Sequence, residues 1–170
     1  MMKEIRLLFG KPKIRDRSKL LSALRELQSS HGCIVQAFDA DKVVSERHLI
    51  YAAEKAMDAI SDCRNIAKDP GVEIMRYASG ERQIERALVM GISDSTERIA
   101  LILVSFDNCC QWPDSSELSR LIELDGRGCT FDCETVKKVF NISNEEIEAV
   151  GEDRIEELVI ERVALVDTYR

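Results

Sequence analysis

The segment Tyr77–Ile84, with the sequence YASGERQI, holds the residues best suited to bind a ligand. We expect a strand to end at Ser79-Gly80 and a helix to begin at Glu81. The first turn of a helix has backbone N–H groups without partners, and a glycine lets an anion approach the backbone closely. Arg82 adds a cationic side chain there. Two interpretations are open: an anion site, or a serine that only caps the helix and stabilises it by about 0.5–2 kcal/mol.

The residue patterns that usually carry catalysis are missing from the sequence. It has no phosphate-binding glycine loop, no H-E-x-x-H zinc helix and no G-x-S-x-G nucleophile turn. His48 is open to two interpretations, a general base or a structural hydrogen-bonding group. Because no base can be paired with a nucleophile, we expect a protein that is not an enzyme and has no cofactor. The competing hypothesis is a small α/β enzyme or binding protein that holds a nucleotide or phosphorylated metabolite at the Ser79-Gly80 strand-helix junction.

The six cysteines are expected to be reduced thiols. The sequence begins with no export signal, and disulfide frameworks belong mainly to exported proteins. It also has no C-x-x-C motif, and neither histidine lies at metal-ligand spacing from the nearest cysteine pairs. We therefore predict no metal site, and we expect most of the cysteines to be small core residues.

Composition bounds the class of protein. The chain has 170 residues, of which 45% are hydrophobic and 32% charged, which is typical of one globular domain over residues 1–170 and excludes global disorder. Its apolar runs are far shorter than the roughly 18–20 residues that a membrane helix needs. We therefore expect a cytoplasmic protein without a membrane partner.

Charge is distributed unevenly along the chain, whose net charge is -7. Residues 1–100 contain 17 Lys or Arg and 15 Asp or Glu, whereas residues 101–170 contain 7 and 16. This asymmetry predicts different partners for the two halves. Between Lys11 and Arg25, six cations stand against Asp16 alone. Such a run is typical of a solvated surface.

Apolar runs and periodicity predict the elements that position these residues. Runs bounded by turn residues predict strands at Ile5–Phe9, Cys33–Phe38, Val72–Ala78 and Ile99–Phe106. Helical spacing predicts helices at Arg17–Leu27, Ser45–Cys63, Glu81–Gly91, Asp114–Leu124, Cys133–Phe140, Asn141–Ala149 and Glu152–Val166. The alternation predicts an α/β fold: a single domain with a central four-stranded, parallel or mixed sheet flanked by helices, and additional helices at the C-terminal end.

Three stretches together resemble one protein family. They are Phe38-Asp39-Ala40-Asp41, the helical pattern Ser45-x-x-His48-Leu49-x-x-Ala52-x-x-Lys55-Ala56, and Glu73–Ile84 with its YASGERQI core. The sequence resembles the PRPK-binding protein (CGI, TPRKB) family, the kinase-binding subunit of the KEOPS complex. That complex makes the threonylcarbamoyl modification of adenosine in certain tRNAs. The resemblance implies a non-catalytic regulatory subunit that binds the small atypical kinase of KEOPS and helps to hold the tRNA by its 3′ CCA end.

A tRNA site at the Ser79-Gly80 junction would combine cations, an aromatic platform and a free backbone. Alternative interpretations are that Lys55 and Arg76 are solvated charges and that Tyr77 is a core residue. The residues expected to contact tRNA are Lys55, Arg76, Tyr77, Ser79, Gly80 and Arg82.

The last predicted helix carries two apolar stripes. One consists of Ile155, Leu158, Val159, Val163 and Val166, and the other of Ile160, Ala164 and Leu165. Either one stripe packs on the protein and the other meets the kinase, or both are buried. Acidic residues around this helix favour a basic protein surface over RNA. The residues expected to bind the kinase are Ile155, Leu158, Val159, Ile160, Arg162, Val163 and Leu165.

Overall fold

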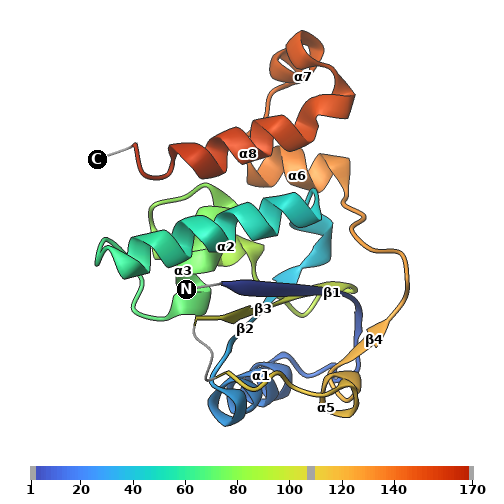
Figure 1. Cartoon of the computed structure of the whole chain (residues 1–170). Coiled ribbons are helices and arrows are strands. Elements are labelled where there is room, and N and C mark those ends of the chain that lie inside the picture. The colour runs from blue at the N-terminus through green and yellow to red at the C-terminus, as the bar shows by residue number, and fades with distance from the viewer. Residues whose placement is uncertain (1–2, 107–109, 169–170) are drawn as a thin grey trace. The chain divides into compact units, whose positions relative to one another are not determined.

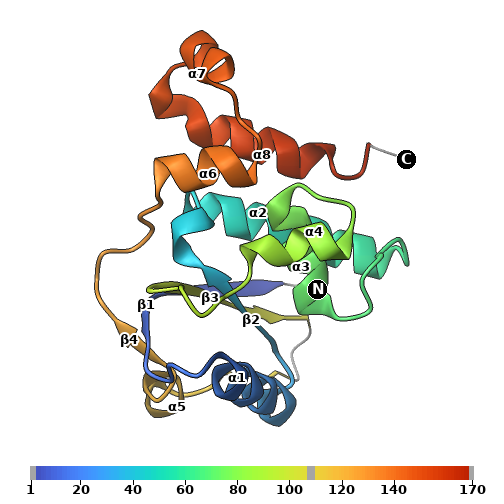
Figure 2. The ribbon, with the colours of Figure 1, turned by 180° about the vertical axis from the view of Figure 1, so that it is seen from behind.

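The computed structural model describes residues 3–106 and 110–168. Strands and helices alternate along the first two-thirds of the chain, and helices follow (Figure 1, Figure 2). The strands are β1 (Glu4–Pro12), β2 (Ile34–Asp39), β3 (Ile99–Ser105) and β4 (Ile122–Leu124). The α-helices are α1 (Arg17–His31), α2 (Glu46–Ser61), α3 (Pro70–Ser79), α4 (Ile84–Ala87), α5 (Ser115–Ser119), α6 (Cys133–Val139), α7 (Asn144–Val150) and α8 (Ile155–Leu165). Short 3-10 helices are η1 (Ala40–Lys42), η2 (Leu88–Met90) and η3 (Glu152–Arg154).

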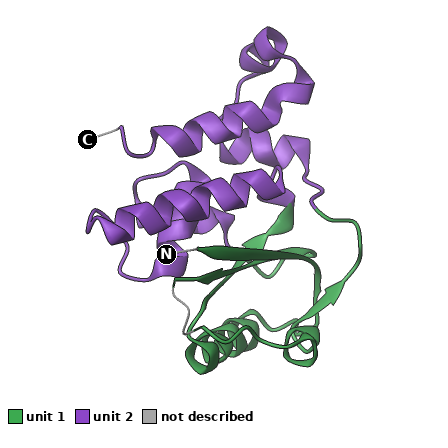
Figure 3. Cartoon of the chain, in the orientation of Figure 1, with its two compact units in different colours: residues 1–40, 92–128 green, residues 41–91, 129–170 purple. Residues whose placement is uncertain are grey.

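The chain forms two compact units (Figure 3). Unit 1 contains residues 1–40 and 92–128, and unit 2 contains residues 41–91 and 129–170. Each unit is therefore built from two separate stretches of chain. The single domain over residues 1–170 stays a prediction, because interleaved compact units also occur within one domain.

The sheet of unit 1 has four strands in the order β2-β3-β1-β4. The four-stranded sheet and the C-terminal helices confirm the predicted α/β class, but the parallel or mixed pairing is wrong, because every pair of neighbours is antiparallel. The crossover through α1 does give β1 and β2 the same direction. However, β3 lies between them and runs opposite to both. All seven residues of β3 are buried, as expected for a central strand.

The third predicted strand, Val72–Ala78, is wrong because this segment is helix α3. Asp69 caps the helix by accepting a hydrogen bond from the Val72 N–H at 2.9 Å. Pro70 occupies the first turn, where a missing N–H costs nothing. The helix is buried on nearly every side, so even its charged residues Glu73 and Arg76 lie in the protein interior. The fourth strand instead is β4, which occupies the end of the predicted helix Asp114–Leu124.

Unit 1 has its core on the face of the sheet that α1 and α5 cover (Figure 1, Figure 2). Leu20, Leu24 and Leu27 of α1 are buried in this core together with residues of β2 and β3. Helix α1 begins at an Asp16 cap and ends at Gly32, which has a left-handed backbone conformation. These signals confirm the helix predicted over Arg17–Leu27, which continues to His31.

Unit 2 is helical. Ser45 caps α2, as predicted, and α2 buries the alanine-rich face that its sequence spacing indicates. Helices α3 and α8 pack against α2. The capping box predicted at Ser143 and Glu146 is present at the start of α7. In the part of the chain that the structure describes, no helix is long and apolar enough to cross a membrane.

Gly10 allows β4 to pair with β1. A Cβ atom at this position would lie 2.1 Å from the Glu123 carbonyl oxygen, far inside van der Waals contact. We expect Gly10→Ala to displace β4 and to lower the free energy of unfolding by about 1–3 kcal/mol, as overpacking typically does. Urea unfolding measures this loss. Gly32→Asn is the control, since asparagine tolerates a left-handed backbone and nothing lies within 4 Å; an equal loss in both variants would contradict the steric argument.

Candidate binding surfaces

The Ser79-Gly80 pair ends helix α3 instead of joining a strand to a helix. Gly80 is the C-cap, with a φ of 70°, and its N–H donates to the carbonyl groups of Arg76 and Tyr77. The end of a helix presents carbonyl oxygens and partial negative charge. The predicted anion site at a helix N-terminus is therefore wrong. The same correction removes the strand-helix junction on which the alternative nucleotide or metabolite site depended.

Ser79 stabilises the end of α3 through hydrogen bonds, and Gly80 allows α3 and α8 to pack closely. The Ser79 Oγ donates to the Arg76 carbonyl at 2.8 Å and accepts from the Glu81 N–H at 3.2 Å. A Cβ atom at Gly80 would lie 3.1 Å from the Cβ of Arg162, so a glycine lets α8 approach closely. Both residues are thus used within unit 2.

Arg76 forms a buried ion pair with Glu73. Its Nη2 and Nε lie 2.8 and 3.1 Å from the two carboxylate oxygens, and both side chains are at most 3% exposed. The Glu73 carboxylate also accepts from the N–H groups of Ile66 and Ala67. The Arg76 guanidinium lies 4.9 Å from the centroid of the Tyr77 ring. Its Nη1 is buried and has no hydrogen-bond partner among the described residues. Arg76 is therefore unavailable to a ligand unless α3 moves.

Tyr77 links α3 to the chain that follows α8. It is 1% exposed, and its hydroxyl donates to the Asp167 carboxylate at 2.5 Å. Burial, followed by the hydrogen bond to Asp167, raises the pKa of Tyr77 to about 12. Arg64 lies 3.6 Å from the same carboxylate. The Tyr77 ring belongs to the core, which was the alternative interpretation, and offers no surface on which a base could stack.

Lys55 and Arg82 are the accessible members of the predicted tRNA set. Lys55 is half-buried on α2, with its ammonium 5.7 Å from the centroid of the Tyr51 ring. Arg82 is exposed in the turn before α4. The structure therefore does not bring the six predicted residues together on one surface.

Sequence reasoning missed an apolar surface on α4 and η2. Leu88 is 54% and Val89 43% exposed, Arg86 is exposed in the helix just before them, and Arg82 is exposed in the turn that precedes this helix. Helical spacing from Ile84 predicts that Leu88 is buried, and this prediction is wrong. The α-helix ends at Ala87 and a 3-10 helix begins at Leu88, so the α-helical spacing counted from Ile84 does not extend to Leu88.

His48 is a structural residue. It is fully buried; its Nδ1 accepts from the Val44 N–H at 3.3 Å, and its Nε2 lies 2.7 Å from the Ala78 carbonyl oxygen. Because a carbonyl only accepts, Nε2 carries the proton and the ring is neutral. Burial lowers the pKa of His48 from 6.5 to about 4, against the opposing effect of the Ala78 hydrogen bond. The general-base interpretation fails because the ring contacts no solvent and no nucleophile.

Helix α8 separates its two apolar stripes. The first stripe is buried, whereas the second, Ile160, Ala164 and Leu165, is only half-buried. On a helical projection the second stripe lies on one face with the exposed Glu157 and Glu161, at spacings of three, four, seven and eight residues. We call these five residues the α8 outer face.

Arg162 works inside unit 2. Its guanidinium donates to the Phe140 carbonyl at 2.7 Å and to both carboxylate oxygens of Glu146 at 3.0 and 3.1 Å. It thereby ties α8 to the chain after α6 and to α7. Of the seven residues predicted to bind the kinase, four are buried and Arg162 is engaged, which leaves Ile160 and Leu165 on the outer face.

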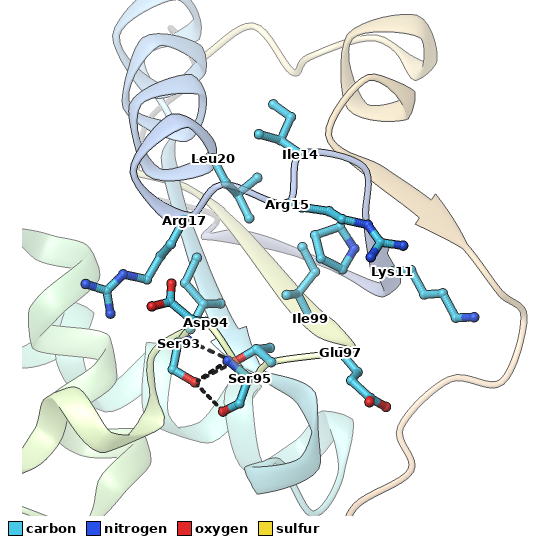
Figure 4. A pocket seen from close by; sticks show the side chains of 13 residues that line it. Lys11, Ile14, Arg15, Arg17, Leu20, Ser93, Asp94, Ser95, Glu97 and Ile99 are labelled. Carbon is cyan, nitrogen blue, oxygen red and sulfur yellow. Dashed lines mark hydrogen bonds between the residues drawn. The ribbon is translucent and has the colours of Figure 1, made fainter.

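Unit 1 contains an open pocket of about 660 Å³ beside the N-terminus of α1 (Figure 4). Ile14, Leu20 and Ile99 give it an apolar lining, and its charged lining consists of Lys11, Arg15, Arg17, Asp94 and Glu97. None of the residues predicted for a site lines this pocket. Its cations belong to the charged run that the sequence shows between Lys11 and Arg25.

The cysteines differ in their exposure. Of the five described ones, all are free thiols, but only Cys33 is buried, while Cys63 and Cys133 are exposed. The expectation of mostly buried cysteines is therefore wrong, and Cys109 lies outside the described residues. Burial, followed by the neighbouring Cys110, raises the pKa of the Cys33 thiol to about 11. The described residues contain no group of three or more His, Cys, Asp or Glu arranged to hold a metal ion.

Comparison with known families assigns the class of protein. Residues 13–167 match the family described as "Kinase binding protein CGI-121", which covers nearly the whole chain. The chain belongs to this family of kinase-binding proteins, as the sequence resemblance predicted. No curated protein matches the chain.

The burial of neutral His48 predicts a pH dependence of stability. The unfolded chain takes up a proton below pH 6.5, whereas the folded protein does so only near pH 4. The contribution of neutral His48 to the free energy of unfolding is therefore fully present above pH 6.5. It falls as the pH drops towards 4, with about 2 kcal/mol lost between pH 7 and pH 5. Urea unfolding across this range measures the loss. His48→Gln should be less stable at pH 7 but lose less on acidification; an unchanged slope would contradict the assignment.

Proposed function

We propose that this protein is a non-catalytic regulatory subunit of the KEOPS complex in the cytoplasm. It binds the small atypical kinase of that complex and holds tRNA by its 3′ CCA end, and so supports threonylcarbamoyladenosine modification of tRNA. Membership in the kinase-binding family and the α8 outer face support kinase binding. The non-catalytic role is supported by the buried position of His48, which faces a backbone carbonyl.

The α8 outer face is the observation that carries the kinase proposal. The buried stripe of α8 packs within unit 2 against α2 and α3, so the helix is already anchored without a partner. Ile160, Ala164 and Leu165 are left partly in water at the spacing of a continuous stripe. A partly exposed apolar stripe on an anchored helix suits the groove or helix of another protein.

Electrostatics favours a basic partner for this face. Unit 2 contains 13 Lys or Arg and 20 Asp or Glu, so it carries all of the net charge of -7, while unit 1 has 11 of each. Glu157 and Glu161 lie within the α8 outer face and are exposed. These charges repel RNA and attract a positively charged protein surface.

Placing a charge in the α8 outer face should abolish kinase binding. We expect Ile160→Glu and Leu165→Glu each to weaken the affinity for the purified kinase by about 30-fold or more, the loss typical of a central interface residue. Isothermal titration calorimetry measures the affinity, and thermal melting checks that the fold is retained.

The matched control is Leu124→Glu, which makes the same change at a residue of unit 1 that is 60% exposed. This variant should bind the kinase as tightly as the wild type. Wild-type affinity in both α8 variants would move the kinase interface elsewhere.

The exposed surface of α4 and η2 supports contact with an RNA end. Arg82 and Arg86 are exposed and can pair with phosphates, and Leu88 and Val89 offer an apolar surface to unpaired bases. Unpaired bases at a 3′ end are free to pack in this way, whereas bases within a duplex are not. This surface replaces Arg76 and Tyr77, whose side chains are engaged in the core.

Removing Arg82 should weaken tRNA binding only when the CCA end is present. We expect Arg82→Ala to reduce the affinity for intact tRNA by about tenfold, because it removes a cation that pairs with a phosphate, and to lower the salt slope by about one. Fluorescence anisotropy with intact and CCA-trimmed tRNA measures both quantities.

Lys68→Ala is the matched control, because Lys68 is an exposed cation of unit 2 without an ion pair to a described residue. It should leave both affinities within about twofold. Equal binding of the two tRNAs by the wild type would refute the proposed role of the CCA end.

A further inference from the structure

Unit 1 has a group of cationic side chains that make no ion pair or hydrogen bond with the described residues. We call it the β1–α1 cluster, and it consists of Lys11, Lys13, Arg15, Arg17, Lys19 and Arg25. All six are exposed, and none forms a side-chain ion pair or hydrogen bond with any residue in the described ranges. By contrast, Arg6 of unit 1 pairs with Glu4, and Arg98 and Arg127 pair with Asp125.

The backbone arranges part of this cluster on one side of the chain. From Lys11 to Arg15 exposure alternates: the three cations are exposed, whereas Pro12 and Ile14 are half-buried. Alternate side chains of an extended chain point to the same side. In Figure 4 Lys11 and Arg15 extend on one side of the pocket and Arg17 on the other. Positive charge therefore borders the pocket from both sides.

Among the described residues, none of the nearby carboxylates forms an ion pair with the cluster. Asp16 accepts the Lys19 N–H as the cap of α1, and Glu123 stands opposite Lys11 in the β1–β4 register without forming an ion pair. Glu26 is exposed on α1, and Asp94 and Glu97 also line the pocket, with Asp94 beside Arg17 in Figure 4. The six cations of the cluster outnumber the five carboxylates and are concentrated within 15 residues.

We propose that the β1–α1 cluster binds the phosphate backbone of a folded RNA, away from its 3′ end. The choice of a tRNA as ligand rests on the proposed function. Binding to phosphates needs only charge, whereas a protein interface needs apolar anchors. Among the described residues no large apolar side chain from 11 to 30 is strongly exposed, since those that are exposed lie at Ile66, Leu88, Val89, Leu124 and Val150. The cluster thus has the chemistry of a backbone contact.

The test compares two triple variants that remove the same charge. The first is Lys11→Gln with Lys13→Gln and Arg15→Gln. The control is Lys68→Gln with Lys138→Gln and Arg154→Gln, three exposed cations of unit 2. Both are titrated with CCA-trimmed tRNA at several salt concentrations, and thermal melting verifies that both are folded.

We expect the cluster variant to bind trimmed tRNA about tenfold more weakly at low salt. Its salt slope should fall by about three, because each of the three substitutions removes one cation that neutralises a phosphate. The control should stay within about twofold of the wild type. Equal affinities and slopes for the two variants would overturn the inference. Displacement of the trimmed tRNA by polyglutamate as efficiently as by unlabelled tRNA would also overturn it and would assign the cluster to an acidic protein.

The readout separates this inference from the proposed function. Trimmed tRNA lacks the CCA end, so its binding does not depend on the Arg82 surface. A wild type that binds intact and trimmed tRNA equally, while the cluster variant binds both weakly, would refute the CCA role and support the backbone contact.

Discussion

The buried ion pair between Glu73 and Arg76 constrains the interior of unit 2. Both side chains lie in the core of a helix that is covered on nearly every side. Removing one partner of such a pair leaves an uncompensated charge and typically costs about 3–5 kcal/mol. Glu73 also holds the loop before α3 through the Ile66 and Ala67 N–H groups. The pair therefore fixes α3 together with the loop that precedes it.

The burial of α3 determines which surfaces remain for partners. Its polar groups are engaged inside: Arg76 with Glu73, Tyr77 with Asp167, and Ser79 with its own helix end. Ligand binding must then use the elements around α3. Two of these elements leave apolar side chains partly exposed to solvent. They are the α8 outer face, with its acidic residues, and the α4–η2 stretch, with its arginines. The acidic residues of the first surface suit it to a basic protein, and the arginines and exposed apolar residues of the second suit it to an RNA end.

Local sequence signals predict most of the fold but fail where burial is complete or pairing is distant. The elements β1, α1, β2, α2 and β3 carry clear periodicity or apolar runs, and their prediction is correct. Helix α3 buries its charged residues as well as its apolar ones, which a local pattern does not indicate, and β4 has only three residues, whose partner β1 is more than 100 residues away. Glu73 and Arg76 are three residues apart in the sequence. In a helix this spacing brings the two side chains together, so their pairing is expected once α3 is known to be helical. The bond from Tyr77 to Asp167 spans 90 residues and leaves no local signal.

The interleaving of the two units constrains the order in which the protein can mature. Ser45 at the start of α2 donates a hydrogen bond to Glu156 of α8, and Tyr77 of α3 donates one to Asp167 after α8. Neither bond can form until the C-terminal stretch of unit 2 has been synthesised. The first stretch of unit 2, residues 41–91, leaves the ribosome before β3 and β4 join the sheet of unit 1. During this interval α2 and α3 expose the apolar surface that α8 will cover. The surface proposed for the kinase is thus formed only once α8 has been synthesised, so a partner that binds the α8 outer face selects chains in which both stretches of unit 2 are present.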